Sequence, residues 1–299
     1  MNLKRNIMFF PMIKNTTTAS RIFIFILLVV FGAVFGSVFA SAVVLLSHGS
    51  LSDVTNLRIA QICSQVAGFV MPPLFYAALV KEKPLDYLGF KKMPAAALLG
   101  VAAMFTVLPF NSAVTEWNEG FTLPESMARL EEYFRMVQDM ADDLMKKFLD
   151  VGNVGGLVTN ILMIAALAAI GEELLFRSVI QPVMIRICRN AFVGILVTSV
   201  LFSAMHFEFY GFIPRIILGI MLGYMFYITG SIWSSMLMHF INNATIVVLY
   251  YLNFNNIVDV DVEKFGSSGN IFVIIGSLAV TVAIFVLCRR LSRRNLEIL

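Results

Sequence analysis

The chain has 299 residues, of which 59% are hydrophobic and 14% are charged, and its mean hydropathy is +0.84. A soluble domain cannot bury so much apolar surface in one core, so the composition predicts an integral membrane protein. The formal net charge of +3 is too small to suggest nucleic acid as a partner, and three cysteines do not form an even disulfide framework.

The expected fold is all-α, a polytopic bundle of transmembrane helices in contact with the lipid bilayer. Scanning for apolar runs that can cross a bilayer gives about eight. The first is too long for the apolar part of a cleaved signal peptide, so we expect a retained first helix. The runs cover residues 22–46, 57–80, 95–108, 157–184, 191–206, 214–229, 232–252 and 271–288.

These runs divide the chain into regions and orient it. Lysines and arginines concentrate on one side if both termini are cytoplasmic, which favours that orientation. The expected location is a bacterial plasma membrane. The polar stretch 110–156 then lies on the other side. The expected regions are an N-terminal segment (1–21), N-terminal transmembrane helices (22–109), the polar stretch (110–156), a central transmembrane core (157–254), and the last helix with a basic tail (255–299).

The polar stretch carries the pattern of an amphipathic helix. Apolar residues recur at helical spacing from Met127 to Phe148, and four acid-before-base pairs stand four residues apart. Thr122 and Glu125 resemble a capping box at its start. We expect a helix resting on the membrane surface, with a lid or docking surface as the alternative. The pairs are Glu125/Arg129, Glu131/Arg135, Asp142/Lys146 and Asp143/Lys147.

Three charged residues interrupt the apolar run 157–184, namely Glu172, Glu173 and Arg177. Each such charge costs about 2.5–3.5 kcal/mol at the centre of a membrane helix, so the three require compensation. Glu173 and Arg177 are four residues apart and can pair along one helix face. Glu172 lies about 100° around the helix and is therefore the freer group.

Further polar residues occur on two other spans. His206 and His239 stand at apolar helix positions, and Asn243 shares a helix face with His239. One intramembrane histidine alone is more often an interhelical hydrogen-bonding group than a catalyst. The complete set, on three separate spans, is most simply reconciled with lipid if it converges on one wetted cavity inside the protein.

Helical rise sets a condition on this convergence. Counting along the expected helices places Glu172 and His239 in the cytoplasmic half of the bilayer but His206 nearer the outer face. We therefore expect the run 191–206 to begin later than Ala191 or to be strongly tilted. The cluster should then lie in the inner half and open toward the cytoplasm.

Three short motifs carry a resemblance to a known family. Residues 172–177, 202–206 and 239–243 match, in this order, E-E-x-x-x-R, F-x-x-x-H and H-x-x-x-N. Inside apolar spans they resemble the signatures of the CAAX protease and bacteriocin-processing family, although Ser178-Val179 follows where many relatives have glycine. The resemblance covers about residues 171–243. It implies intramembrane hydrolysis of a peptide bond in a membrane-embedded or lipidated peptide or protein.

The resemblance also implies roles for the polar residues. Glu172 and His206 would activate a water molecule, and His239 and Asn243 would stabilise the oxyanion. The remaining Glu-Arg pair of the first motif would support the helix. A carboxylate in a low-dielectric cavity is a suitable general base, and amide and imidazole N–H groups are suitable donors to a developing alkoxide.

Two alternatives remain open. Glu172, His206 and His239 are also a one-carboxylate, two-imidazole set that could hold zinc with an open fourth position. Asn243 suits an oxyanion hole better than a zinc shell, so we favour a site without a metal cofactor. The alternative to an enzyme is a non-catalytic scaffold or regulator of a sensor kinase or peptide exporter, in which the polar cluster locks the bundle.

Overall fold

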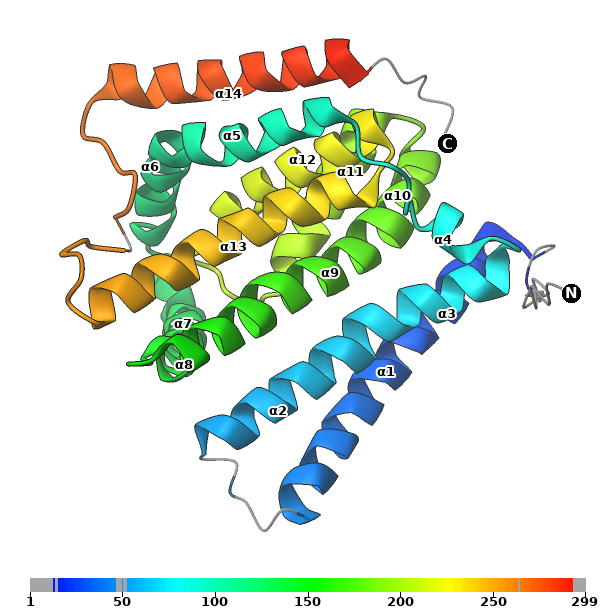
Figure 1. The fold of residues 1–299 in the computed structure, drawn as a ribbon, viewed down its shortest axis with the longest axis horizontal. Coiled ribbons are helices and arrows are strands. Elements are labelled where there is room, and N and C mark those ends of the chain that lie inside the picture. The colour runs from blue at the N-terminus through cyan, green and yellow to red at the C-terminus, as the bar shows by residue number, and fades with distance from the viewer. Residues whose placement is uncertain (1–12, 14–15, 47–49, 51–52, 263, 293–299) are drawn as a thin grey trace, which may run out of the picture.

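In the computed structural model the described residues are 13, 16–46, 50, 53–262 and 264–292, and all regular secondary structure among them is helical (Figure 1). The predicted all-α fold is confirmed. Several basic residues that entered the prediction of orientation lie outside the described residues. They are Lys4, Arg5, Lys14, Arg293 and Arg294.

The N-terminal helices form an antiparallel hairpin set at an angle to the other helices (Figure 1). Its second arm is a continuous rod in which a π-helical turn joins two α-helices. Gly32 permits close packing of the two arms, because a Cβ atom there would lie 2.1 Å from the carbonyl oxygen of Ala67. The elements are α1 (Thr18–Leu46), α2 (Val54–Gln65), η1 (Val66–Val70), α3 (Met71–Val80) and the short α4 (Pro84–Tyr87).

The centre of the molecule is a rod that runs from Val154 to Cys188. Two π-helical segments widen its turns, a feature often found at functional sites. Figure 1 shows α13 lying beside this rod, while α5 lies beside α14. The rod comprises α8 (Val154–Asn160), η4 (Ile161–Leu167), α9 (Ala168–Glu173), η5 (Leu174–Ile180) and α10 (Gln181–Cys188). The helices that follow are α11 (Ala191–Ala204), α12 (Phe212–Thr229), α13 (Ile232–Phe254) and α14 (Ile271–Ser292).

All eight expected apolar runs form helices, although Val107, Met205 and His206 lie in turns, and the helices differ in length. Among the described residues, six helices are long and apolar enough to span a bilayer. A seventh candidate is the pair formed by η2 with α5 (Ala95–Thr106) and α6 (Leu108–Glu119), which is bent by 46°. In the most apolar 18-residue stretch of α1, and likewise of α14, only 17% of the residues are buried in the protein, so these helices present apolar surface to lipid. The chain is an integral membrane protein.

The remaining run, 191–206, forms α11, which explains how His206 reaches the protein interior. Of the two expected alternatives, a start after Ala191 is wrong, because α11 begins there and ends at Ala204; a strong tilt of this helix stays a prediction. At about 1.5 Å per residue it rises roughly 21 Å, less than the roughly 30 Å hydrocarbon core. His206 follows its last turn and therefore stops short of the far membrane surface.

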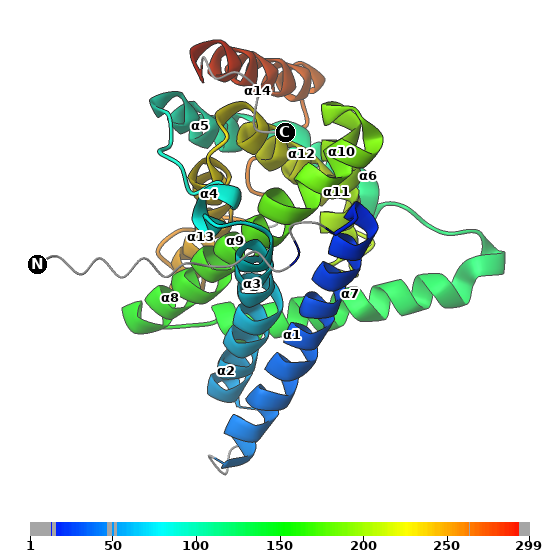
Figure 2. The same ribbon diagram turned by 90° about the vertical axis from the view of Figure 1, so that its right-hand side faces the viewer.

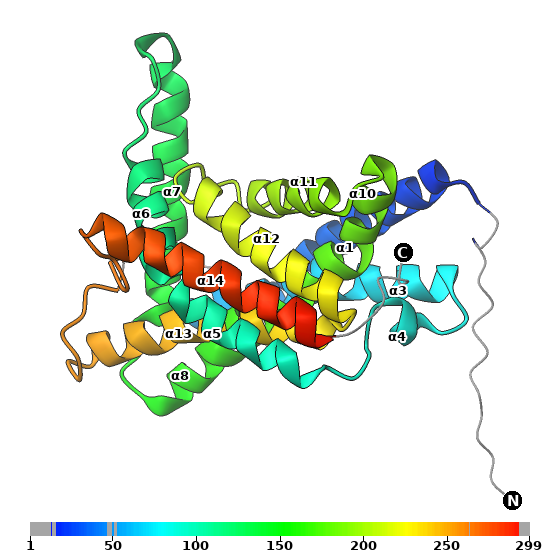
Figure 3. The ribbon, with the colours of Figure 1, turned by 90° about the horizontal axis from the view of Figure 1, so that it is seen from above.

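The predicted amphipathic helix is present as α7 (Ala128–Leu149), which follows the 3₁₀ turn η3 (Glu125–Met127). It projects away from the bundle (Figures 2 and 3). The predicted capping box is wrong, because the 3₁₀ turn separates Thr122 from the helix and no side chain caps Met127. Instead Glu131 accepts a hydrogen bond from the Leu123 N–H at 2.8 Å.

Candidate active site

The polar residues of the central rod meet α13. Glu173 Oε2 lies 3.1 Å from Arg177 Nε, and both side chains are fully buried, so the expected pairing is confirmed. The other carboxylate oxygen of Glu173 lies 3.1 Å from Nδ1 of His239. Helix α13 thus contributes an imidazole to a charge pair formed within the rod.

Arg177 is held by packing more than by hydrogen bonds. Its contact with Glu173 is close but does not have hydrogen-bond geometry, and its Nη1 and Nη2 atoms have no hydrogen-bond partner among the described residues. The guanidinium carbon lies 5.0 Å from the centre of the Phe202 ring. An aromatic face stabilises a desolvated cation, so Phe202 supplies part of the required compensation.

His239 stands between the two glutamates. Its Nε2 atom lies 3.8 Å from Glu172 Oε2, beyond hydrogen-bond distance. Glu172 keeps 17% of its side-chain surface exposed, whereas Glu173 keeps none. With His239 doubly protonated, the two carboxylates, the guanidinium and the imidazolium sum to zero charge, which makes the cluster compatible with burial.

Glu172 and His206 line one cavity of about 120 Å³. It lies between the rod and the α2–η1 arm, whose Phe69 also lines it. Gly171 permits this approach, because a Cβ atom there would lie 2.9 Å from Cβ of Phe69. Since one water needs about 10–15 Å³ of such space, the cavity can hold several water molecules.

The tautomer of His206 follows from its backbone contact. Its Nδ1 atom lies 3.0 Å from the Phe202 carbonyl oxygen, which can only accept a hydrogen bond. Nδ1 therefore carries the proton, and in the neutral ring Nε2 keeps a lone pair. Phe207 then turns the chain in a left-handed conformation with φ of 58°, which is uncommon for a bulky residue.

The structure brings His206 and His239 to the same aromatic ring. The Phe202 ring centre is 5.1 Å from that of His206 and 6.0 Å from that of His239. Asn243 lies apart from the cavity that Glu172 and His206 line. Its amide Nδ2 donates to the Ile164 carbonyl at 3.3 Å and its Oδ1 accepts from Asn242 Nδ2 at 3.1 Å, so one N–H of Asn243 remains for another acceptor.

A zinc site requires Glu172, His206 and His239 to share one coordination sphere. Among the described residues, no three His, Cys, Asp or Glu side chains are grouped closely enough to hold a metal ion. This donor set does not fit zinc in the arrangement observed.

Gln61 and Gln65 of α2 were not among the predicted site residues, and they line the cavity opposite Glu172. The Oε1 atom of Gln65 is buried and has no hydrogen-bond partner among the described residues. Such an acceptor can take a peptide N–H or a water. The signal was present in the sequence, since two glutamines four residues apart stand in an apolar span.

Comparison with known proteins agrees with the motifs. Residues 154–245 match a family model described as type II CAAX prenyl endopeptidase Rce1-like, and the matched range contains all six predicted site residues. No curated protein and no solved structure matches the chain. Residues 154–245 of this integral membrane protein are therefore similar to the Rce1-like type II CAAX prenyl endopeptidases.

Proposed function

We propose that the protein is an intramembrane endopeptidase that hydrolyses a peptide bond in a membrane-embedded or lipidated peptide or protein, with Glu172 as the general base. The observation that carries this proposal is the cavity shared by Glu172 and His206, which has room for water. Glu173, by contrast, is committed to Arg177 and His239. Only the first glutamate is therefore available to a substrate.

The reaction begins with a water molecule between the Glu172 carboxylate and His206 Nε2. Glu172 accepts a proton as the water oxygen bonds to the scissile carbonyl carbon. When the tetrahedral intermediate collapses and the C–N bond breaks, that proton passes to the leaving amine. The lone pair on His206 Nε2 positions the water and can relay the proton.

The oxyanion donors are the second amide N–H of Asn243 and the Nε2–H group that His239 carries when doubly protonated. Glu173 is a positioning residue, because its contact with Nδ1 of His239 orients that ring. Asn243 bonds to Ile164 of the rod.

The decisive experiment compares purified wild type with Glu172→Gln. The substrate is the membrane peptide that accumulates uncleaved in cells lacking the protein. Glutamine preserves the shape of the side chain but cannot act as a base, so cleavage should be lost. The thermal midpoint should stay the same or rise, because a carboxylate no longer has to be buried. His206→Ala should be similarly inactive.

Glu132→Gln is the matched control, because it removes one exposed carboxylate of α7. Cleavage retained by Glu172→Gln would refute the mechanism. Inactivation by a chelator, with stoichiometric metal in the purified protein, would replace it with a zinc mechanism. If the protein is a scaffold, Glu172→Gln will leave the cellular phenotype unchanged.

We also propose that both termini are cytoplasmic, that the 110–156 segment lies outside, and that the membrane is a bacterial plasma membrane. Single cysteines at Lys92 and Gln138, in a chain whose native cysteines are replaced by serine, test the orientation. A membrane-impermeant thiol reagent applied from outside should label the cysteine at position 138 alone. Labelling of both from one side would contradict this orientation.

A further inference from the structure

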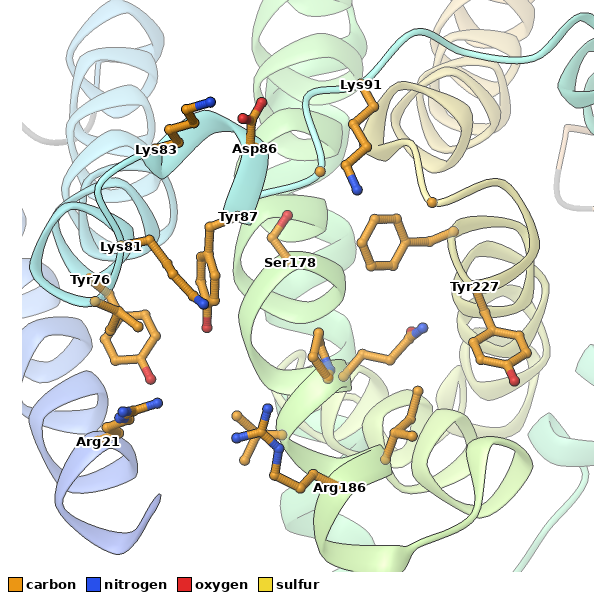
Figure 4. Close-up of a pocket in the computed structure, with 18 of the residues that line it drawn as sticks. Arg21, Tyr76, Lys81, Lys83, Asp86, Tyr87, Lys91, Ser178, Arg186 and Tyr227 are labelled. Carbon is orange, nitrogen blue, oxygen red and sulfur yellow. The ribbon is translucent and has the colours of Figure 1, made fainter. Parts of the chain in front are cut away.

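A second and larger cavity lies where several membrane-spanning helices end. It has a volume of about 690 Å³ and shares no lining residue with the active-site cavity. Its walls come from the first turn of α1 and from the ends of α3, α10 and α12, with α4 and the following loop above (Figure 4). Ser178 of its wall lies beyond Glu172 on the same rod, roughly 9 Å further along the axis.

The lining is strongly cationic. Five basic residues and two acidic ones line the cavity, which leaves three net positive charges. The ammonium groups of Lys81 and Lys91 and the guanidinium of Arg186 form no ion pair with any described residue. The basic residues are Arg21, Lys81, Lys83, Lys91 and Arg186, and the acidic ones are Glu82 and Asp86.

Part of this charge converges on two tyrosines. Figure 4 shows the ends of Arg21, Lys81 and Arg186 directed toward the space around the hydroxyls of Tyr76 and Tyr87. Figure 4 also shows Lys83 and Asp86 pointing away from that space. The cavity therefore has a defined polar centre.

The tyrosines add hydrogen-bond donors to this centre. Tyr76 is 2% exposed, and its ring centre lies 6.2 Å from that of Tyr87. Burial raises the pKa of Tyr87 well above its usual value, and the neighbouring Tyr76 raises it further. The Tyr87 hydroxyl therefore keeps its proton at neutral pH and donates it to Tyr76, and an anion between the two rings can accept that hydrogen bond in place of Tyr76.

The position of the cavity matches the headgroup layer of a membrane. Spanning helices end at the membrane surface, and basic and tyrosine side chains gather there. One wall belongs to α1, whose outer face exposes Phe23 and Ile26 by 62% and 53%. A lipid lying along α1 would therefore bring its headgroup to the mouth of the cavity.

The wall of the cavity also contains a buried acceptor without a hydrogen-bond donor, the side-chain oxygen of Gln181. Gln181 is 1% exposed, and its amide nitrogen donates to the Gly223 carbonyl at 2.9 Å. Its Oε1 atom has no hydrogen-bond partner among the described residues. A hydroxyl of a headgroup, or a protonated phosphate oxygen, can supply that hydrogen bond.

We propose that this cavity binds a phosphate-bearing anion, with the phosphoryl oxygens held by Lys81, Arg186 and the Tyr87 hydroxyl. Planar guanidinium groups suit phosphate oxygens, and basic pockets between membrane helices recognise anionic headgroups. The volume lies within the range of about 300–1,000 Å³ that is usual for ligand sites. The phosphoryl group can come from an anionic phospholipid or from free phosphate.

Binding to the purified, delipidated full-length protein tests this. The probes are dioleoylphosphatidylglycerol, dioleoylphosphatidylcholine, oleate and inorganic phosphate, each added in neutral detergent. Native mass spectrometry counts the bound molecules, and the thermal midpoint reports stabilisation. We expect saturable binding of one phosphatidylglycerol, or of one inorganic phosphate if the ligand is soluble, and weaker binding of the other two probes.

Variants locate the site. Lys81→Gln/Arg186→Gln should weaken binding about 30-fold, and Tyr87→Phe about fivefold. The matched control is Lys92→Gln/Arg189→Gln, which removes the same two kinds of charge outside the cavity lining and should bind as the wild type does. The thermal midpoint of each cavity variant is also measured without ligand. A midpoint equal to that of the control variant shows that the cavity variant is folded.

Three results would overturn the proposal. In the first, neither phosphatidylglycerol nor inorganic phosphate binds saturably. In the second, oleate binds as tightly as phosphatidylglycerol, so the site does not select phosphate. In the third, the control variant loses as much affinity as the cavity variant, so the attraction is diffuse surface charge.

Discussion

The chain contains the same short pattern, a glutamate followed four residues later by an arginine, in two very different regions. On α7, Glu131 and Arg135 lie 2.7 Å apart with 18% and 50% of their side-chain surfaces exposed. In the central rod, Glu173 and Arg177 lie 3.1 Å apart with no exposed side-chain surface. Helical spacing produces both contacts, so spacing alone does not distinguish them.

The surroundings make the difference. Water solvates the pair on α7, and either side chain can lose its partner at little cost. Glu173 and Arg177 are fully buried, so other protein groups must complete their environment, namely His239 and the ring of Phe202. The buried pair is thus one part of a larger unit that also positions an imidazole beside Glu172.

The largest expected effect comes from breaking the buried pair. Glu173→Gln or Arg177→Met alone leaves a charge without its partner, so each should lower the free energy of unfolding by about 3–5 kcal/mol. The double variant should recover part of that loss. Denaturant or thermal unfolding in detergent measures all three, and strictly additive effects would show that the two residues are not coupled.

Asn243→Ala should affect turnover with little change in stability. Loss of one oxyanion donor typically lowers turnover by about 10²- to 10³-fold. The neighbouring Asn242→Ala is the control, because it removes the hydrogen bond to Asn243 without removing the proposed donor. Steady-state cleavage rates of the two variants decide the matter, and equal rates would exclude an oxyanion role for Asn243.

The exposed pair should respond much less than the buried one. Arg135→Met removes a solvated, salt-screened contact, so its thermal midpoint should change far less than that of Arg177→Met. Raising the salt concentration should further reduce the change in thermal midpoint that Arg135→Met causes. A loss as large as that of Arg177→Met would mean that α7 is buried against membrane or partner.

The smallest expected effect is a pH dependence of the stability that Glu131 of α7 contributes. The hydrogen bond from Arg135 lowers the pKa of Glu131 below its usual value, and the Leu123 N–H lowers it further. The ionised form is favoured in the folded state, so its contribution is present above about pH 4.3, the usual value for glutamate, and is lost as pH falls through the depressed pKa. The stability difference between wild type and Glu131→Gln should therefore vanish at low pH. A difference that grows on acidification would contradict the sign.

Several features followed from local sequence alone. The apolar runs predicted the helices, because a helix in lipid must satisfy its own backbone hydrogen bonds whatever its neighbours are. The pairing of Glu173 with Arg177 was likewise predictable, since it lies within one helix. The capping box at Thr122 failed because an intervening 3₁₀ turn moved the start of α7.

What the sequence determined by itself is therefore the membrane class, the helices, the motifs of the family and the one charge pair within the rod. Tertiary structure alone decided which groups meet: that Glu172 and His206 share a cavity with Gln65, and that Asn243 faces Ile164. The basic cavity is of the same kind, since α1, α3 and α10 bring its walls together from distant parts of the chain. The reason is physical: a contact within a helix is set by its repeat, whereas a cavity depends on how separate helices pack.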